Sequence, residues 1–145
     1  MKLALYAGTF DPPTSGHLDI IRRAAPLFSS LIIGVAADGG KKTLFSIDER
    51  IEKLLLATKE LPNIQVAAYQ GLTWQFAKKN HIDVLIRSLR PGEDASMEFS
   101  LAAANRELGG LETLFLAADP ALSFISSSLV REILQAGGSA EKYLA

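Results

Sequence analysis

Apolar and polar residues alternate in blocks along the whole chain. Short apolar or β-branched runs, typical of strands buried on both faces, are separated by longer stretches in which apolar residues recur every three or four positions, as on one face of a helix. The predicted strands are Leu3–Ala7, Leu31–Ala37, Ile64–Ala68, Val84–Arg87 and Thr113–Leu116. This alternation predicts an α/β fold with a five-stranded parallel sheet flanked by helices.

Helices are predicted between and after these strands. The first spans His17–Phe28, whose apolar residues recur at helical spacing. The second begins after Ser46, which forms an S-x-x-E capping-box pattern with Glu49. The others are Thr73–Asn80, Ala95–Leu108 and Ser126–Ala136. Gly137-Gly138 follows the last of these, as expected where a helix ends at a glycine.

Composition limits the class of protein further. A chain of 145 residues with 48% hydrophobic residues is the size of one compact domain, which we expect to span residues 1–145. The 15 basic and 16 acidic residues nearly cancel. No overall field therefore draws the protein to nucleic acid or to an anionic membrane, and we expect it to bind neither.

The sequence has no cysteine, which excludes disulfides, thiolate metal sites and cysteine nucleophiles. The apolar run at the N-terminus is too short for a signal sequence or a membrane span. We expect a soluble, cytoplasmic protein.

Four polar segments indicate where the chemistry lies, because ligands of open α/β sheets bind beyond the carboxyl ends of the strands. GTFDPPTSGH follows the first strand, DGGKKT the second and RSLRP the fourth, and FISSS precedes the last helix. In the first segment Gly8 permits a tight turn. His17 falls at the start of a helix, where free N–H groups favour an anion. The segments' cations and hydroxyls, Lys41, Lys42, Arg87, Arg90 and Ser126–Ser128, would suit a polyphosphate.

Most of these residues also have a structural explanation. Lys41 and Lys42 could be part of a solvated loop, Arg87 and Arg90 could form structural ion pairs, and the serines could simply cap a helix. His17 is different. It follows a turn rich in glycine and proline that leads into a helix, and packing of a hydrophobic core alone does not need such a turn. We interpret His17 as a functional residue.

GTFDPPTSGH resembles the N-terminal signature of the nucleotidylyltransferase superfamily, (H/T)-x-G-H, matched here by Thr14–His17. The lysine pair after the second strand, LIRSLRPGEDASMEFSLAAANREL and SFISSSLVREI resemble the phosphopantetheine adenylyltransferases in order and spacing. The resemblance covers nearly the whole chain. It implies a Rossmann-like domain, usually assembled as a homohexamer, that transfers the adenylyl group of ATP to 4'-phosphopantetheine and releases pyrophosphate, in coenzyme A biosynthesis.

The resemblance also implies roles for individual residues. His17 and Lys41 would be catalytic, and Thr9, Lys41, Thr73 and Arg87 would bind phosphopantetheine. The residues implied to bind ATP are Thr9, Phe10, His17, Ser88, Leu89, Arg90, Glu98, Leu122, Ser123, Phe124, Ile125, Ser126, Ser127 and Ser128. ATP would arrive with Mg²⁺. Because no Asp or Glu cluster has metal-ligand spacing, the ion would be held mainly by phosphates and water.

Some positions depart from the family pattern. Ser88 stands where the family usually has glycine, Met97 where tyrosine is frequent and Leu122 where an aromatic residue is common. One alternative is another adenylyl or cytidylyl transferase of the superfamily, acting on nicotinate mononucleotide or a small alcohol phosphate. A second is a regulatory module that binds the nucleotide without turning it over.

Overall fold

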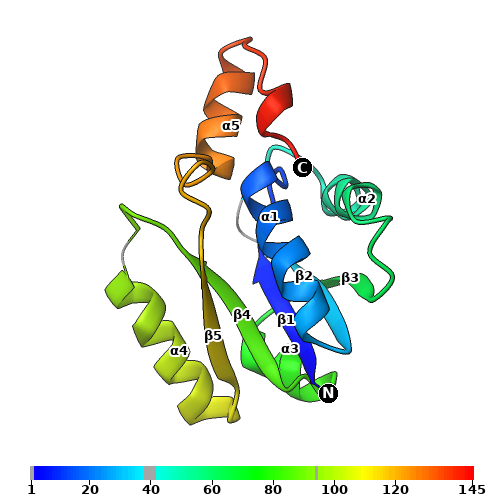
Figure 1. The fold of residues 1–145 in the computed structure, drawn as a ribbon, viewed down its shortest axis with the longest axis vertical. Coiled ribbons are helices and arrows are strands. Elements are labelled where there is room, and N and C mark those ends of the chain that lie inside the picture. The colour runs from blue at the N-terminus through cyan, green and yellow to red at the C-terminus, as the bar shows by residue number, and fades with distance from the viewer. Residues whose placement is uncertain (1, 38–41, 94) are drawn as a thin grey trace.

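The computed structural model describes residues 2–37, 42–93 and 95–145. At its centre is a five-stranded parallel sheet of order β3-β2-β1-β4-β5 (Figure 1). The strands are β1 Leu3–Gly8, β2 Ser30–Ala36, β3 Ile64–Tyr69, β4 Val84–Leu89 and β5 Glu112–Ala117. The predicted fold class is therefore confirmed. From β1 to β3 the strands are added towards one edge of the sheet, whereas β4 and β5 are added on the other side of β1. At this change a crevice opens between the carboxyl ends of β1 and β4.

The helices are α1 Ser15–Ala24, α2 Ile47–Ala57, α3 Thr73–Lys79, α4 Ala95–Gly109 and α5 Ser127–Gln135, with 3-10 turns at Ala25–Leu27 and Glu141–Tyr143. Helix α1 ends earlier than the sequence pattern predicted. Pro26 lies in the 3-10 turn that follows it and lacks the N–H that would continue the α-helical hydrogen bonds. Within the described ranges, no helix is long and apolar enough to cross a membrane.

Each face of the sheet carries its own hydrophobic cluster. On one face, alternate residues of β1, β2 and β4 pack against α1 and α2, with Ile21 and Leu54 fully buried. The opposite face packs against α3 through Ala77 and Trp74. Figure 1 shows α5 and the C-terminal turn beyond the carboxyl ends of the strands. These two segments do not cover a face of the sheet, so their residues can contribute to a binding site at its edge.

The ends of the helices only partly follow the predicted capping. Ser46 Oγ accepts a hydrogen bond from the Glu49 N–H at 3.1 Å, but the returning bond from the Glu49 side chain is not formed. A complete capping box occurs at α1 instead, between Thr14 and His17. The predicted glycine end of α5 is confirmed, since Gly137 has φ 82° and the Gly138 N–H donates to the Ile133 carbonyl at 2.9 Å.

Candidate active site

The site begins with the turn that follows β1. Phe10 has φ 53°, a left-handed conformation that is uncommon for an aromatic residue, and its side chain is only 2% exposed. A Cβ at Gly8 would come within 3.2 Å of the Phe10 ring. That ring meets the rings of Tyr6 and His17 edge-on, at centroid distances of 5.4 and 4.8 Å. The lack of a side chain at Gly8 therefore leaves room for the Phe10 ring, which packs against the His17 ring.

The capping box of α1 fixes the chemical state of His17. The His17 N–H donates to Thr14 Oγ1 at 3.3 Å, and the Thr14 N–H donates in return to His17 Nδ1 at 3.0 Å. Because Nδ1 accepts this bond, the neutral imidazole carries its proton on Nε2. Nε2 has no hydrogen-bond partner in the part of the chain that the structure describes, and His17 lines the pocket. His17 therefore presents one free N–H donor to a ligand.

The surroundings of His17 keep this imidazole neutral. Burial is the main cause that lowers its pKa from 6.5 to about 4, and the positive charges of Arg90 and Arg87 act in the same direction. At neutral pH His17 is therefore a hydrogen-bond donor without a net charge, and it has no proton to give up as a general acid of ordinary strength.

Side chains from α2, β4 and α5 hold the backbone of the turn. They donate to four carbonyl oxygens: Arg87 to Ala7 at 2.9 Å, Arg50 to Thr9 at 2.8 Å, Arg131 to Asp11 at 2.7 Å and Ser127 to Pro12 at 2.8 Å. The buried Asp11 carboxylate in turn accepts the N–H groups of Leu44 and Phe45, both at 2.8 Å. The turn is therefore fixed by residues distant in sequence.

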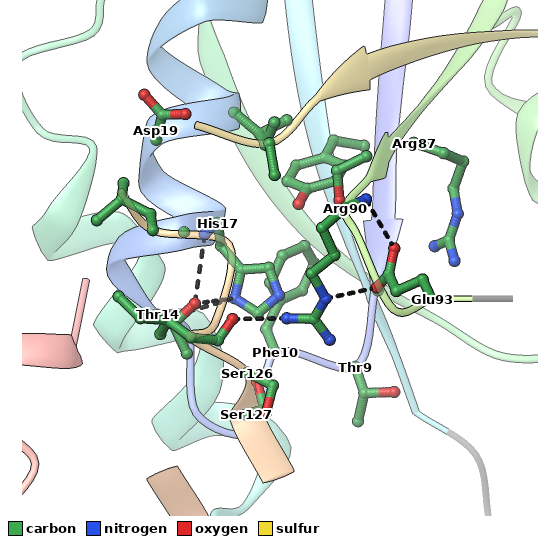
Figure 2. A pocket seen from close by; sticks show the side chains of 18 of the residues that line it. Thr9, Phe10, Thr14, His17, Asp19, Arg87, Arg90, Glu93, Ser126 and Ser127 are labelled. Carbon is green, nitrogen blue, oxygen red and sulfur yellow. Dashed lines mark hydrogen bonds and ion pairs between the residues drawn. The ribbon is translucent and has the colours of Figure 1, made fainter. Parts of the chain in front are cut away.

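A pocket of about 360 Å³ opens above this turn, within the usual size range of small-molecule sites (Figure 2). It brings together most of the residues that the sequence singled out: Thr9, Phe10, His17, Arg87, Ser88, Arg90, Glu98, Leu122, Ile125, Ser126, Ser127 and Ser128. Leu89, Ser123, Phe124 and Thr73 do not line it. Lys41 lies outside the described residues.

The residues outside the lining have other neighbours. The Thr73 hydroxyl lies 3.1 Å from the Tyr69 hydroxyl at the start of α3. Ser123 donates to the Pro120 carbonyl, and the exposed Phe124 ring meets Tyr143 edge-on at 5.6 Å.

The arginines of the pocket are already paired with carboxylates. Arg87 makes a two-bond fork with Glu98, at 3.0 and 2.7 Å, and this hydrogen bonding raises the pKa of Arg87 above its usual value. Arg90 pairs with Glu93 at 2.8 Å and donates to the Ile125 carbonyl at 2.6 Å. An anion that binds Arg90 must therefore compete with Glu93.

The serine segment both caps and borders the site. Ser126 is the N-cap of α5 and accepts from the Leu129 N–H at 3.0 Å, as the structural explanation proposed. Ser126, Ser127 and Ser128 nevertheless all line the pocket, so the first turn of α5 faces it. Free N–H groups in such a turn favour an anion.

Other pocket residues were missed from the sequence: Tyr6, Asp19, Glu93, Asp119 and Arg131. Arg131 could have been found, because it follows Ser127 by one helical turn. Tyr6 is a core residue of β1, and burial raises its pKa to about 12. No pattern in the sequence distinguishes Glu93 from the acidic residues of other loops.

Comparison with known proteins places the chain in a class. Residues 5–133 match the family described as cytidylyltransferase-like. Two solved structures share the fold at 16% and 13% identity. One is described as a nicotinate-nucleotide adenylyltransferase from Vibrio parahaemolyticus (TM-score 0.72, 100% of this chain and 88% of that one). The other is a bifunctional NMN adenylyltransferase/ADP ribose pyrophosphatase from Francisella tularensis (TM-score 0.76, 99% and 45%). The fold is thus the Rossmann-like fold of nucleotidyltransferases.

Curated relatives narrow the class. The phosphopantetheine adenylyltransferase of Moorella thermoacetica is 45% identical over 139 residues, covering 95% of this chain and 87% of its own. That of Caldanaerobacter subterraneus subsp. tengcongensis is 44% identical over 145 residues, covering 99% and 91%. The chain belongs to the cytidylyltransferase-like family and, within it, to the phosphopantetheine adenylyltransferases.

The low pKa of His17 predicts a pH dependence of stability. The unfolded chain takes up a proton near pH 6.5 and the folded protein only near pH 4, so this contribution to stability is present above pH 6.5 and is lost as pH falls through pH 4. In a His17→Gln variant, glutamine can still complete the capping box but does not titrate. Urea unfolding should show the wild type losing stability relative to this variant from pH 7 to 4, by at most about 1.4 kcal/mol per pH unit. If the free energies of unfolding of the wild type and of His17→Gln changed in parallel with pH, the low pKa of His17 would be contradicted.

Proposed function

We propose that the protein catalyses the reaction of a phosphopantetheine adenylyltransferase, transferring the adenylyl group of ATP to 4'-phosphopantetheine with release of pyrophosphate. The setting we propose is cytoplasmic coenzyme A synthesis. The observation that carries the proposal is the neutral His17, whose Nε2–H faces a pocket bordered by Arg90 and the first turn of α5 (Figure 2). The 44–45% identity to enzymes of that name supports the choice of substrates.

The reaction needs positioning more than proton transfer. The acceptor phosphate is already ionised near neutral pH, so its oxygen can attack the α-phosphorus without a general base or a protein nucleophile. The bond from the α-phosphorus to the bridging oxygen then breaks, and that oxygen leaves with pyrophosphate. What the protein must supply is alignment of two anions and donors where charge accumulates.

The described residues can supply these donors. His17 Nε2–H would donate to an α-phosphate oxygen, and being uncharged it would not trap the product through a strong ion pair. Arg90 and the N–H groups of α5 would receive the leaving pyrophosphate. Arg87, held by Glu98, would face the acceptor, with Lys41 added from the segment between β2 and α2 and Thr73 reaching the pantetheine arm.

Magnesium would enter as part of MgATP. In the described ranges, no group of three or more His, Cys, Asp or Glu side chains is placed to hold a metal ion. Glu93 and Glu98, two carboxylates that line the pocket, each hold an arginine. These residues fit a Mg²⁺ bound chiefly by phosphate oxygens and water.

Substitution of His17 tests the mechanism. His17→Ala removes both the pocket donor and the capping bond, and we expect turnover to fall about a hundred- to thousandfold, the usual cost of one preorganised donor. His17→Gln should lose a large part of the activity while keeping the stability of α1. Pyrophosphate release with MgATP and 4'-phosphopantetheine measures both, and near-wild-type turnover of His17→Ala would exclude the mechanism.

The choice of acceptor separates the alternatives. Release with nicotinate mononucleotide instead of phosphopantetheine would keep the superfamily and change the substrate. A folded protein that binds MgATP and releases no pyrophosphate with either acceptor would be a regulatory module.

The Arg90–Glu93 pair predicts a variant that binds ATP more tightly. Glu93→Gln keeps the shape of the side chain but removes the charge that competes with phosphate for Arg90. We expect the KM for ATP to fall about two- to fivefold, as for removal of a partly exposed ion pair worth about 0.5 to 1 kcal/mol. Glu60→Gln, at an exposed position outside the pocket, is the control. A raised KM for Glu93→Gln would mean that Glu93 holds Arg90 in its binding position.

We also propose that the protein assembles as a homohexamer. Helix α4 has no buried residue, and Met97, Phe99, Leu101, Leu108 and, on β5, Leu114 are 47–62% exposed. Apolar surface of this kind marks an interface. Trp74 is partly buried beneath this helix, where it contacts Gly109.

Sedimentation velocity tests the assembly. It should give a hexamer for the wild type and smaller species for Phe99→Glu, and a monomeric wild type would exclude the assembly.

A further inference from the structure

Arg50 of α2 is buried, and the residues that the structure describes give it no acidic partner. Its side chain is 4% exposed, and within the described ranges no carboxylate lies within 4.0 Å of its guanidinium. Burying a charge without a counterion costs folding free energy. Fixing α2 alone does not require this cost, because an apolar side chain could pack in the same place.

The guanidinium binds backbone carbonyls where two strands separate. β1 and β2 pair up to Gly8 and Val35, so the next pair in register would be Thr9 and Ala36. Those two carbonyls instead accept from the same Nη1 of Arg50, at 2.8 and 3.2 Å. Nε of Arg50 lies 3.3 Å from the Ser46 carbonyl, which anchors the side chain to its own helix. Arg50 therefore takes the place of the next rung between β1 and β2.

This arrangement sets the orientation of the peptide between Thr9 and Phe10. Among the described peptide bonds only Asp11–Pro12 is cis, so the 9–10 peptide is trans and its N–H points opposite to its C=O. The carbonyl faces Arg50, which does not line the pocket, whereas Thr9 and Phe10 do. The Phe10 N–H has no acceptor within the described ranges. A charged donor on the carbonyl also polarises the peptide and strengthens its N–H as a donor.

We infer that Arg50 is a positioning residue that acts through this peptide: it aims and polarises the Phe10 N–H toward the phosphates of the nucleotide and keeps Phe10 in its left-handed conformation. The inference rests on the proposed function only for the identity of the anion. Arg50 touches no substrate itself. It transmits a positive charge into the pocket through one peptide unit.

The test compares ligands with and without phosphates. Arg50→Gln should weaken MgATP binding, measured by calorimetry, about ten- to hundredfold, the loss typical of one hydrogen bond to a charged group. Adenosine, which lacks phosphates, should bind as it does to the wild type. Arg50→Lys, which keeps the charge, should recover part of the MgATP affinity.

A matched control on the same helix separates positioning from stability. Thr58 is equally buried at the other end of α2 and donates to the Leu54 carbonyl at 2.8 Å. Thr58→Val should lower the unfolding temperature without changing MgATP affinity. Wild-type affinity of Arg50→Gln for MgATP, or equal losses for MgATP and adenosine, would overturn the inference.

Other outcomes separate this inference from the proposed function. If the wild type releases no pyrophosphate with phosphopantetheine but Arg50→Gln still weakens MgATP selectively, only the reaction assignment fails. If the wild type binds no MgATP, a crystal structure of Arg50→Gln decides. A rotated 9–10 peptide would support positioning, and an unchanged one would overturn it.

Discussion

The hydrogen bond from the Thr14 N–H to Nδ1 of His17 is the interaction on which the site depends most. It satisfies a backbone donor that the start of α1 would otherwise leave open, so it contributes to the helix as any capping bond does. The same bond occupies one ring nitrogen and leaves the proton on the other. One contact thus serves folding and chemistry together, and the low pKa of His17 keeps the imidazole neutral across the range in which cells operate.

The turn below His17 is held by an unusual density of charged donors. Three arginines from three different elements bind carbonyl oxygens between Ala7 and Asp11. Because these carbonyl oxygens are already hydrogen-bonded by arginines, they cannot turn toward the pocket. There, their negative partial charge would repel a polyphosphate. Of the three, Arg87 also pairs with Glu98 and Arg131 lies 3.9 Å from the Asp11 carboxylate. Arg50 alone is held only by backbone carbonyls within the described ranges, and it is the most deeply buried of them.

The sequence predicted the strands well. β1 and β2 are continuous apolar runs that the fold buries, and the edge strands β3 and β5, although only partly buried, are still rich in apolar and β-branched residues. It also predicted that the polar segments after β1 and β4 and before α5 meet at one rim, since the carboxyl ends of parallel strands share one edge. It identified Ser46 as the N-cap of α2 correctly but missed the complete capping box of α1, because glutamate is the expected partner at the third position and histidine is not. The early end of α1 follows from Pro26, which the apolar spacing through Phe28 obscured.

Arg50 and Glu93 could not be found in this way. Arg50 reads as an ordinary charged residue of an amphipathic helix until the fold brings the carbonyls of Thr9 and Ala36 to it. Glu93 belongs to a short loop whose path depends on Gly92, with φ 86°, and on the packing of the segments around it. Both positions are decided by tertiary contacts that no local pattern records.

The donors that hold the turn after β1 are separated from it in sequence by 41, 80, 115 and 120 residues. Such contacts close long loops of the chain, so none of them is available to the turn as an isolated segment. The site therefore exists only once α5 has docked onto the first strand's turn. A ligand that binds there stabilises all three supporting elements together, which makes the occupied protein a more cooperative unit than the free one.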